Sequence, residues 1–344
     1  MRHDARMVLE VGSEGDNESR DVVRVVCASV SRVPNAVHAE MEKARDEALR
    51  RYPSDGIHAM LVCQGGWVLY WAEGSGEAID NLLARMKRDP RHHSMRVLHR
   101  SRGPRLLPTP WSMMLAANVA RGSSLDFARR LIELQNDLQR NHQYSPMSVI
   151  RRLSAPLQLP PAPGVAIVDP EAFHRVGISA AVNQQAFDYV AWLGNTHQQP
   201  VVQRRLSGTE GYDSGSDYVE YMGHAYPCRV IAVARTTLTY GIRRAFYPDW
   251  HCMVLLFSGD HRLDEALLER LAEGFKDLYR QPALLGFAPD EVAREAIATI
   301  ASSLKLDFNS ITLCNNGDFA TVNMEISETL SALRPPVDSL WSAV

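Results

Sequence analysis

Prolines crowd the segment from residue 146 to residue 164, which ends in the run Leu-Gln-Leu-Pro-Pro-Ala-Pro-Gly. Proline fixes φ and lacks a backbone N–H, so such a segment favours an extended linker over a helix or a strand. A chain of 344 residues is long enough to bury a separate core on each side of this linker. We therefore predict one domain at 21–118 and a second at 165–344. The polar start at 1–20 is predicted to be disordered, and 119–145 to form a connecting or capping helix.

The composition is that of a soluble globular protein, with 45% hydrophobic and 22% charged residues and a formal net charge of −3. That balance provides no basic field for nucleic acid, and no apolar run is long enough to suggest a membrane span. The cysteines are scattered and none forms a Cys-x-x-Cys pair, which disfavours a disulfide framework and a zinc site. We expect a cytoplasmic protein that binds no metal, membrane or nucleic acid.

The first domain shows the order βαββαβ, which is typical of a ferredoxin-like fold. A hairpin is indicated where two apolar runs flank Cys63-Gln64-Gly65-Gly66. The predicted strands are Val22–Ser29, Gly56–Val62, Trp67–Trp71 and Met95–His99, and the predicted helices are Asn35–Tyr52 and Ser75–Arg88.

The second domain alternates strands and helices, which indicates a mostly parallel sheet covered on both faces. The predicted strands are Phe173–Gly177, Tyr218–Met222, Arg229–Ala234, Met253–Ser258, Ala283–Phe287 and Ala320–Ile326. The predicted helices are Asn183–Gly194, Asp264–Tyr279 and Glu291–Leu304. The fold class is therefore α/β (α+β), with two domains of different topology.

Landmarks in the first domain resemble the BLUF family, the blue-light sensors that use flavin. They are the first strand, the Gly56-Ile57 start of the second, Trp67 to Gly74, Asp89-Pro90-Arg91-His92, and Trp111-Ser112-Met113. The resemblance implies a flavin pocket in which a Tyr on the first strand and a Gln on the third exchange hydrogen bonds after light absorption.

This chain departs from that pattern at the positions that touch flavin. Cys27 stands at the Tyr position and Tyr70 at the Gln position, while the Asn pair of the family falls at Arg51 and Tyr52. Of the switch region only Trp111 and Met113 remain. A flavin whose polar groups are unmatched would lose about 1–3 kcal/mol per group. We expect bulkier side chains to fill the pocket, so that no cofactor is bound; the alternative is a changed pocket that still holds FAD or FMN.

The second domain resembles a Ras-like bacterial small GTPase more faintly. A phosphate loop has Gly, four residues and then Gly-Lys-Ser/Thr, because glycine N–H groups and the Lys contact phosphate. Here Gly177 is followed, after four residues, by Val182-Asn183-Gln184, and Asp290 alone matches the guanine-reading motif. The resemblance therefore implies a pseudo-GTPase, with Gly177, Asn183, Gln184 and Asp290 at degenerate nucleotide positions.

The loss of flavin-contacting residues in the first domain and of nucleotide-binding motifs in the second favours a non-catalytic bacterial signalling or scaffold protein. Such a protein would act by protein–protein contact and form a homo-oligomer. If it self-associates, the helix predicted at 124–141 is a candidate interface through Leu131 and Leu138. A flavin- or other ligand-binding sensor that regulates a partner is the second hypothesis, and a GTPase-like nucleotide switch is the third. The partner, the pathway and the stimulus stay open.

Overall fold

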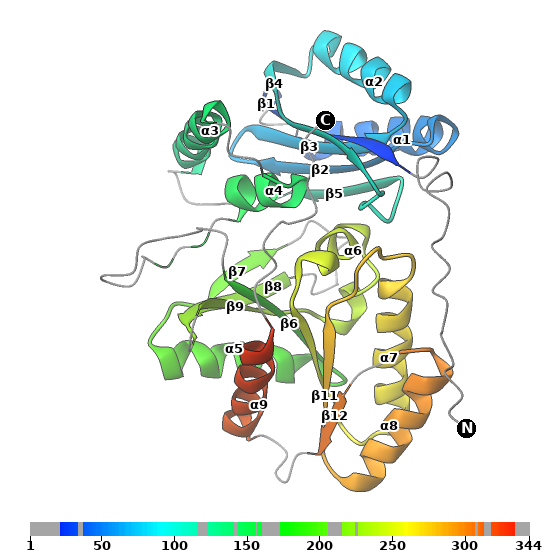
Figure 1. The fold of residues 1–344 in the computed structure, drawn as a ribbon, viewed down its shortest axis with the longest axis vertical. Coiled ribbons are helices and arrows are strands. Elements are labelled where there is room, and N and C mark those ends of the chain that lie inside the picture. The colour runs from blue at the N-terminus through cyan, green and yellow to red at the C-terminus, as the bar shows by residue number, and fades with distance from the viewer. Residues whose placement is uncertain are drawn as a thin grey trace, which may run out of the picture.

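The computed structural model describes residues 21–33, 37–115, 123–140, 144–155, 157, 159, 173–205, 215–223, 226–306, 309–312 and 318–333. The predicted disordered start lies outside these residues, as does the end of the predicted linker at 160–164. Figure 1 shows two sheets, each with its own helices, stacked along the long axis of the molecule.

The first sheet has five strands in the order β4-β1-β3-β2-β5. All neighbours are antiparallel except β2 and β5, which are parallel. The predicted βαββαβ order is confirmed, and β5 adds an edge strand that the sequence pattern did not indicate. The elements are β1 (Val22–Ser31), α1 (Val37–Asp55), β2 (His58–Gln64), β3 (Trp67–Gly74), α2 (Gly76–Arg88), β4 (His92–Gly103) and β5 (Trp111–Leu115).

Successive side chains along these strands point to opposite faces, and both faces of the first sheet are covered. One face, which includes Cys27 and Tyr70, packs under α1 and α2. The other face, which includes Val26 and Trp71, packs on α3 (Ser123–Gln139), α4 (Pro146–Ser154) and α6 (Gly241–Phe246). Since α6 belongs to the second half of the chain, the two halves share this core.

Helix α4 occupies the first part of the predicted linker, so the linker prediction is wrong at 146–154. Pro146 is at the start of the helix, where its missing N–H costs nothing, and the Ser145 hydroxyl accepts from the Ser148 N–H at 2.9 Å. The buried side chains of α4, such as Ile150 and Leu153, then pack against the first sheet. A proline at the first position of a helix is therefore compatible with that helix, whereas prolines in a linker favour an extended chain.

Helix α3 turns Leu131 and Leu138 inward, toward the same core. These residues are therefore unsuited to the oligomer interface that the sequence suggested, because their replacement would disturb the core instead. The apolar side chains that α3 exposes are Leu125 and Ile132, at 78% and 57%.

The second sheet has seven strands in the order β12-β11-β10-β6-β9-β8-β7, and its five strands from β12 to β9 are parallel. Helices α5 and α9 cover one face, and α7 and α8 cover the other (Figure 1). The strands are β6 (His174–Ala180), β7 (Val202–Arg205), β8 (Gly215–Met222), β9 (Pro227–Ala232), β10 (Cys252–Leu256), β11 (Ala283–Ala288) and β12 (Asn309–Thr312). The helices are α5 (Asn183–His197), α7 (His261–Phe275), α8 (Glu291–Ser303) and α9 (Phe319–Ala332), with short 3₁₀ turns at Arg235–Thr237 and Tyr247–Asp249. A mixed α/β fold with two sheets is confirmed.

The strand predicted at 320–326 is wrong, because this segment forms α9. Its buried side chains are Val322, Ile326 and Leu330, which recur every four residues and so lie on one helical face. Asp318 caps the helix by accepting from the backbone N–H groups of Ala320 and Thr321. Within the described residues, no helix has the length and apolarity that a membrane crossing requires.

Candidate functional site

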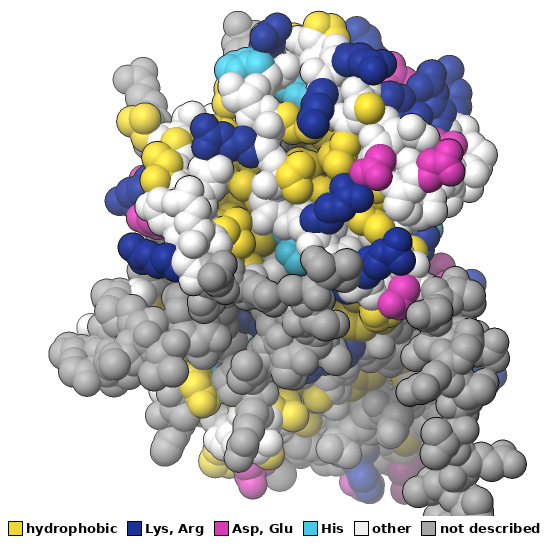
Figure 2. Space-filling view, turned by 45° about the horizontal axis from the view of Figure 1, so that its top comes forward, with side chains coloured by type: hydrophobic (Ala, Val, Ile, Leu, Met, Phe, Trp, Pro, Cys, Tyr) yellow, Lys and Arg dark blue, Asp and Glu magenta, His cyan; other side chains and the backbone are white. Residues whose placement is uncertain are grey.

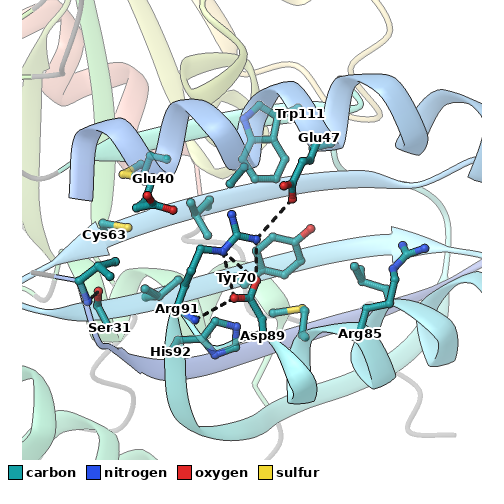
Figure 3. Close-up of a pocket in the computed structure, with 18 of the residues that line it drawn as sticks. Ser31, Glu40, Glu47, Cys63, Tyr70, Arg85, Asp89, Arg91, His92 and Trp111 are labelled. Atoms are coloured by element: carbon teal, nitrogen blue, oxygen red, sulfur yellow. Dashed lines mark hydrogen bonds and ion pairs between the residues drawn. The ribbon is translucent and has the colours of Figure 1, made fainter. Parts of the chain in front are cut away.

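A pocket of about 220 Å³ lies between α1 and α2, over one face of the first sheet (Figure 3). Apolar side chains from both helices and from the strands form its walls. The lining residues are Ser31, Val33, Glu40, Met41, Ala44, Glu47, Ala48, Arg51, Tyr52, Leu61, Cys63, Val68, Tyr70, Leu82, Arg85, Met86, Asp89, Arg91, His92 and Trp111.

Four of the six residues predicted at flavin positions line this pocket: Arg51, Tyr52, Tyr70 and Trp111. Cys27 is buried directly opposite Tyr70 in the pairing of β1 with β3, and burial raises the pKa of its thiol to about 12. Met113 packs at the edge of the same apolar cluster. Strands β1, β3 and β5 thus bring Cys27, Tyr70, Trp111 and Met113 to one face of the sheet, and helix α1 places Arg51 and Tyr52 over that face.

Two tyrosine hydroxyls meet at the pocket, where the Oη atoms of Tyr52 and Tyr70 lie 2.6 Å apart. Desolvation raises the pKa of both phenols, so both stay protonated. One hydroxyl donates to the other, which leaves a single proton free for a further acceptor. The expectation that bulky side chains fill the pocket is wrong: the tyrosines pair with each other, and a cavity remains beside them.

Trp111 contributes a second donor. Its indole ring lies 5.9 Å from the ring of Tyr52 and 6.2 Å from that of Tyr70, measured between centroids. Its Nε1–H is buried and has no hydrogen-bond partner among the described residues. A buried donor without a partner costs about 1–3 kcal/mol. A ligand with ring nitrogens or carbonyl oxygens would recover that cost.

Charged residues link the two sides of the pocket. The Arg91 guanidinium lies 2.6 Å from the Asp89 carboxylate and 3.4 Å from that of Glu47 on α1 (Figure 3). Burial acts to raise the pKa of Asp89, but the hydrogen bonds from Arg91 outweigh it and leave that pKa lowered. Sequence reasoning missed Arg85 as a lining residue. Its helical spacing from Leu82, which places both on one face of α2, was the available signal.

A buried carboxylate holds the segment that leads into β5. Glu73, at the end of β3, is fully buried, and its Oε2 accepts from the backbone N–H groups of Leu106 and Leu107 at 2.8 and 2.9 Å. Burial raises the pKa of Glu73 to about 7, although those hydrogen bonds and the Arg24 and Arg105 charges oppose the shift. The carboxyl therefore keeps its proton to a higher pH in the folded chain than in the unfolded one.

We expect Glu73→Gln to remove a fall in stability that the wild type shows as pH rises from about 4.5 to about 7. In that window the folded state binds the extra proton, so raising the pH favours unfolding, by roughly 3 kcal/mol in total. Gln resembles the protonated acid and can still accept both N–H groups. Urea unfolding across this range should show the two proteins equally stable near pH 4.5 and the variant more stable near pH 8. A difference that does not change with pH would contradict this assignment.

The positions predicted for a nucleotide loop are not arranged as one. Gly177 lies inside β6 against the Trp250 ring, and only Ala181 and Val182 separate this strand from α5. The Asn183 side chain accepts from the Arg235 N–H at 2.9 Å. Gln184 donates to Asp188 on the surface of α5, and Asp290 caps the start of α8. In this described stretch there is no glycine-rich loop between β6 and α5 whose N–H groups could surround phosphate.

Comparison with known families finds a match in the first domain. Residues 22–114 match the family model described as BLUF, sensors of blue-light using FAD. No curated protein matches the chain. Among the described residues, no cluster of three or more His, Cys, Asp or Glu side chains could hold a metal ion.

Solved structures similar to this chain include several BLUF proteins. "BlsA photo-activated state" is 18% identical, with 38% of this chain and 91% of that chain covered and a TM-score of 0.28. "BlrB - a BLUF protein, dark state structure" is 20% identical over 40% of this chain and 98% of that chain, with a TM-score of 0.27. "Klebsiella pneumoniae BlrP1 with FMN and cyclic diGMP, no metal ions" is 10% identical over 83% and 76%, with a TM-score of 0.28.

The family match corrects one expectation. We expected the first domain to bind no cofactor. The matched family uses FAD, so that expectation is contradicted. The match also favours the sensor hypothesis over the non-catalytic scaffold. It covers the first domain alone and does not address the Ras-like resemblance of the second.

Proposed function

We propose that this chain is a flavin-binding sensor, an atypical BLUF photoreceptor that holds FAD or FMN between α1 and α2 and regulates a partner protein. The observation that carries the proposal is the pocket itself, which lies among the residues that the family resemblance assigned to flavin. Its apolar walls suit a planar ring, and its unpartnered donors suit the ring's acceptors.

The side chains present fit the polar edge of such a ring. Within the described part of the chain the Trp111 Nε1–H has no partner, and the Tyr52–Tyr70 pair has one proton left to donate. Flavin, when bound, supplies blue-light absorption. Tyr70 has no amide to rearrange, so the hydrogen-bond change would fall to the two hydroxyls, whose donor and acceptor roles can be exchanged by rotating their O–H bonds.

A direct contact connects the pocket to the second domain. Ser112 and Thr109, on either side of Pro110-Trp111, lie against Gly241 at the start of α6. A Cβ on Gly241 would be 3.1 Å from the Ser112 Cβ and 3.1 Å from the Thr109 Oγ1, so the two segments are in close contact. A movement of Trp111 would therefore press on α6. We propose that the second domain receives the signal this way and passes it on by protein contact.

The first test is to purify the protein in the dark, denature it by heat, and separate the supernatant by reversed-phase chromatography. Flavin in a 1:1 ratio to protein, with an absorption shift of the native sample under blue light, would support the proposal. If no flavin is released and neither added FAD, FMN nor riboflavin binds, the proposal is wrong. Flavin that binds without any light-induced shift would leave a ligand sensor and remove the photoreceptor.

Replacing two alanines, one at a time, with tryptophan tests whether flavin binds in this pocket. Ala44, on α1, lines the pocket and is half-buried, so Ala44→Trp is expected to fill the cavity and abolish flavin binding. Ala84, on α2, is exposed and does not line it, so Ala84→Trp should bind flavin normally. Fluorescence titration with FMN gives the affinities, and thermal unfolding shows whether each variant folds. Normal FMN binding by a folded Ala44→Trp protein would place the flavin elsewhere.

A further inference from the structure

The charges that line the pocket are balanced except at one end. Each acidic lining residue lies beside a basic side chain: Glu40 beside Lys43 at 2.7 Å, and both Glu47 and Asp89 beside Arg91. Arg51 also lines the pocket, and among the described residues no carboxylate forms an ion pair with it. Two arginines of the lining, Arg51 and Arg85, therefore have no acidic partner within the lining itself.

The two remaining arginines approach the pocket from different helices. Arg51 comes from α1 and Arg85 from α2. Arg85 has one acidic neighbour, Asp55, at 3.7 Å, and both side chains of that pair are well exposed, at 41% and 37%. An exposed pair at that distance contributes little. Figure 3 shows Arg85 at the opposite end of the pocket from Ser31 and Cys63.

Exposure divides the pocket into two parts. Tyr52, Tyr70 and the Trp111 indole nitrogen are buried, whereas Arg51 and Arg85 are open to solvent. A ligand that fits both parts has a planar ring for the buried end and a negatively charged group for the mouth. Figure 2 shows Lys and Arg side chains around a hydrophobic area on the first domain, which would favour the approach of an anion.

We propose that Arg51 and Arg85 form a phosphate-recognition site at the mouth of this pocket, so that the chain selects phosphorylated flavin over riboflavin. This inference rests on the proposed function and adds the part of the ligand that is recognised. The arginines donate several N–H groups in a planar arrangement that suits phosphate oxygens. Because they come from α1 and α2, a phosphate between them would also tie the two helices together.

The test compares riboflavin, which has no phosphate, with FMN by fluorescence titration of the full chain. We expect FMN to bind about tenfold to a hundredfold more tightly, as charge-assisted hydrogen bonds to phosphate would give. Arg51→Gln and Arg85→Gln should each reduce this preference without changing riboflavin affinity, and the double variant should abolish it. Arg88→Gln removes an exposed charge from the same helix, outside the lining, and should keep the preference.

The outcomes separate this inference from the function on which it rests. If riboflavin and FMN bind the wild type equally, the phosphate site is wrong and the flavin pocket stands. If Arg51→Gln and Arg85→Gln weaken riboflavin as much as FMN, these arginines contact the ring and the phosphate site is again wrong. If neither flavin binds, both proposals fail.

Discussion

Replacing Asp249 with Ala is expected to lower the free energy of unfolding by about 3–5 kcal/mol, the usual cost of breaking a buried ion pair from one side. The Asp249 carboxylate lies between two arginines. It is hydrogen-bonded to Arg151 of α4, and its Oδ2 lies 2.9 Å from the Nε of Arg175 in β6. Both arginines are nearly inaccessible, at 6% and 3% exposed, so water cannot replace the lost carboxylate.

The same group joins the two halves of the molecule, because α4 packs on the first sheet and β6 lies in the second. The effect should therefore appear in probes of both domains, which urea unfolding followed by tryptophan fluorescence and circular dichroism can monitor. Asp80→Ala removes one partner of the exposed Asp80–Arg100 pair and should change the unfolding free energy by less than about 1 kcal/mol. A similarly small effect at Asp249 would mean that the arginines find other partners.

The sequence predicted the first domain well because two independent signals agree there. Strands such as Val22–Ser29 are β-branched and apolar, and the family landmarks fix their order. Which residues lie on the sheet face beneath the pocket also follows from the strands, since Cys27 and Tyr70 are paired neighbours on that face. What could not be predicted is where long side chains end. Tyr52 and Tyr70 look large enough to fill a flavin site, but their hydroxyls hydrogen-bond to each other and a cavity remains beside them.

The two wrong predictions, at 146–154 and at 320–326, involve residues that occur in more than one kind of structure. Pro146 begins a helix although proline also marks linkers, and the deciding feature is the Ser145 cap before it. The run at 320–326 contains Thr, Val and Ile, which favour strands, but its apolar residues recur with helical spacing once Leu330 is included. A longer window and attention to caps would have corrected both.

Gly177 is the clearest case of a motif residue whose neighbours decide its role. The sequence placed it at the start of a degenerate phosphate loop, whereas the structure has it within β6 under the Trp250 ring. A Cβ at this position would lie 2.1 Å from the Trp250 Cζ3 and 2.8 Å from the Met253 Sδ. Glycine is therefore needed for packing, because the ring occupies the space that any other side chain would take.

Gly177→Ala is accordingly expected to destabilise the protein by about 3 kcal/mol or more, at the upper end for overpacked cores, because the buried indole is rigid and cannot shift without moving its neighbours. Gly76→Ala provides the matched control, since a Cβ there meets nothing closer than 3.8 Å and the substitution should be neutral or slightly stabilising. Combining Gly177→Ala with Trp250→Leu should cost less than the sum of the two single effects, because the smaller side chain leaves room for the methyl group. Urea unfolding of the four variants gives the comparison. If Gly177→Ala were as stable as the wild type and altered only nucleotide binding, the loop interpretation would be right and the packing role of this glycine wrong.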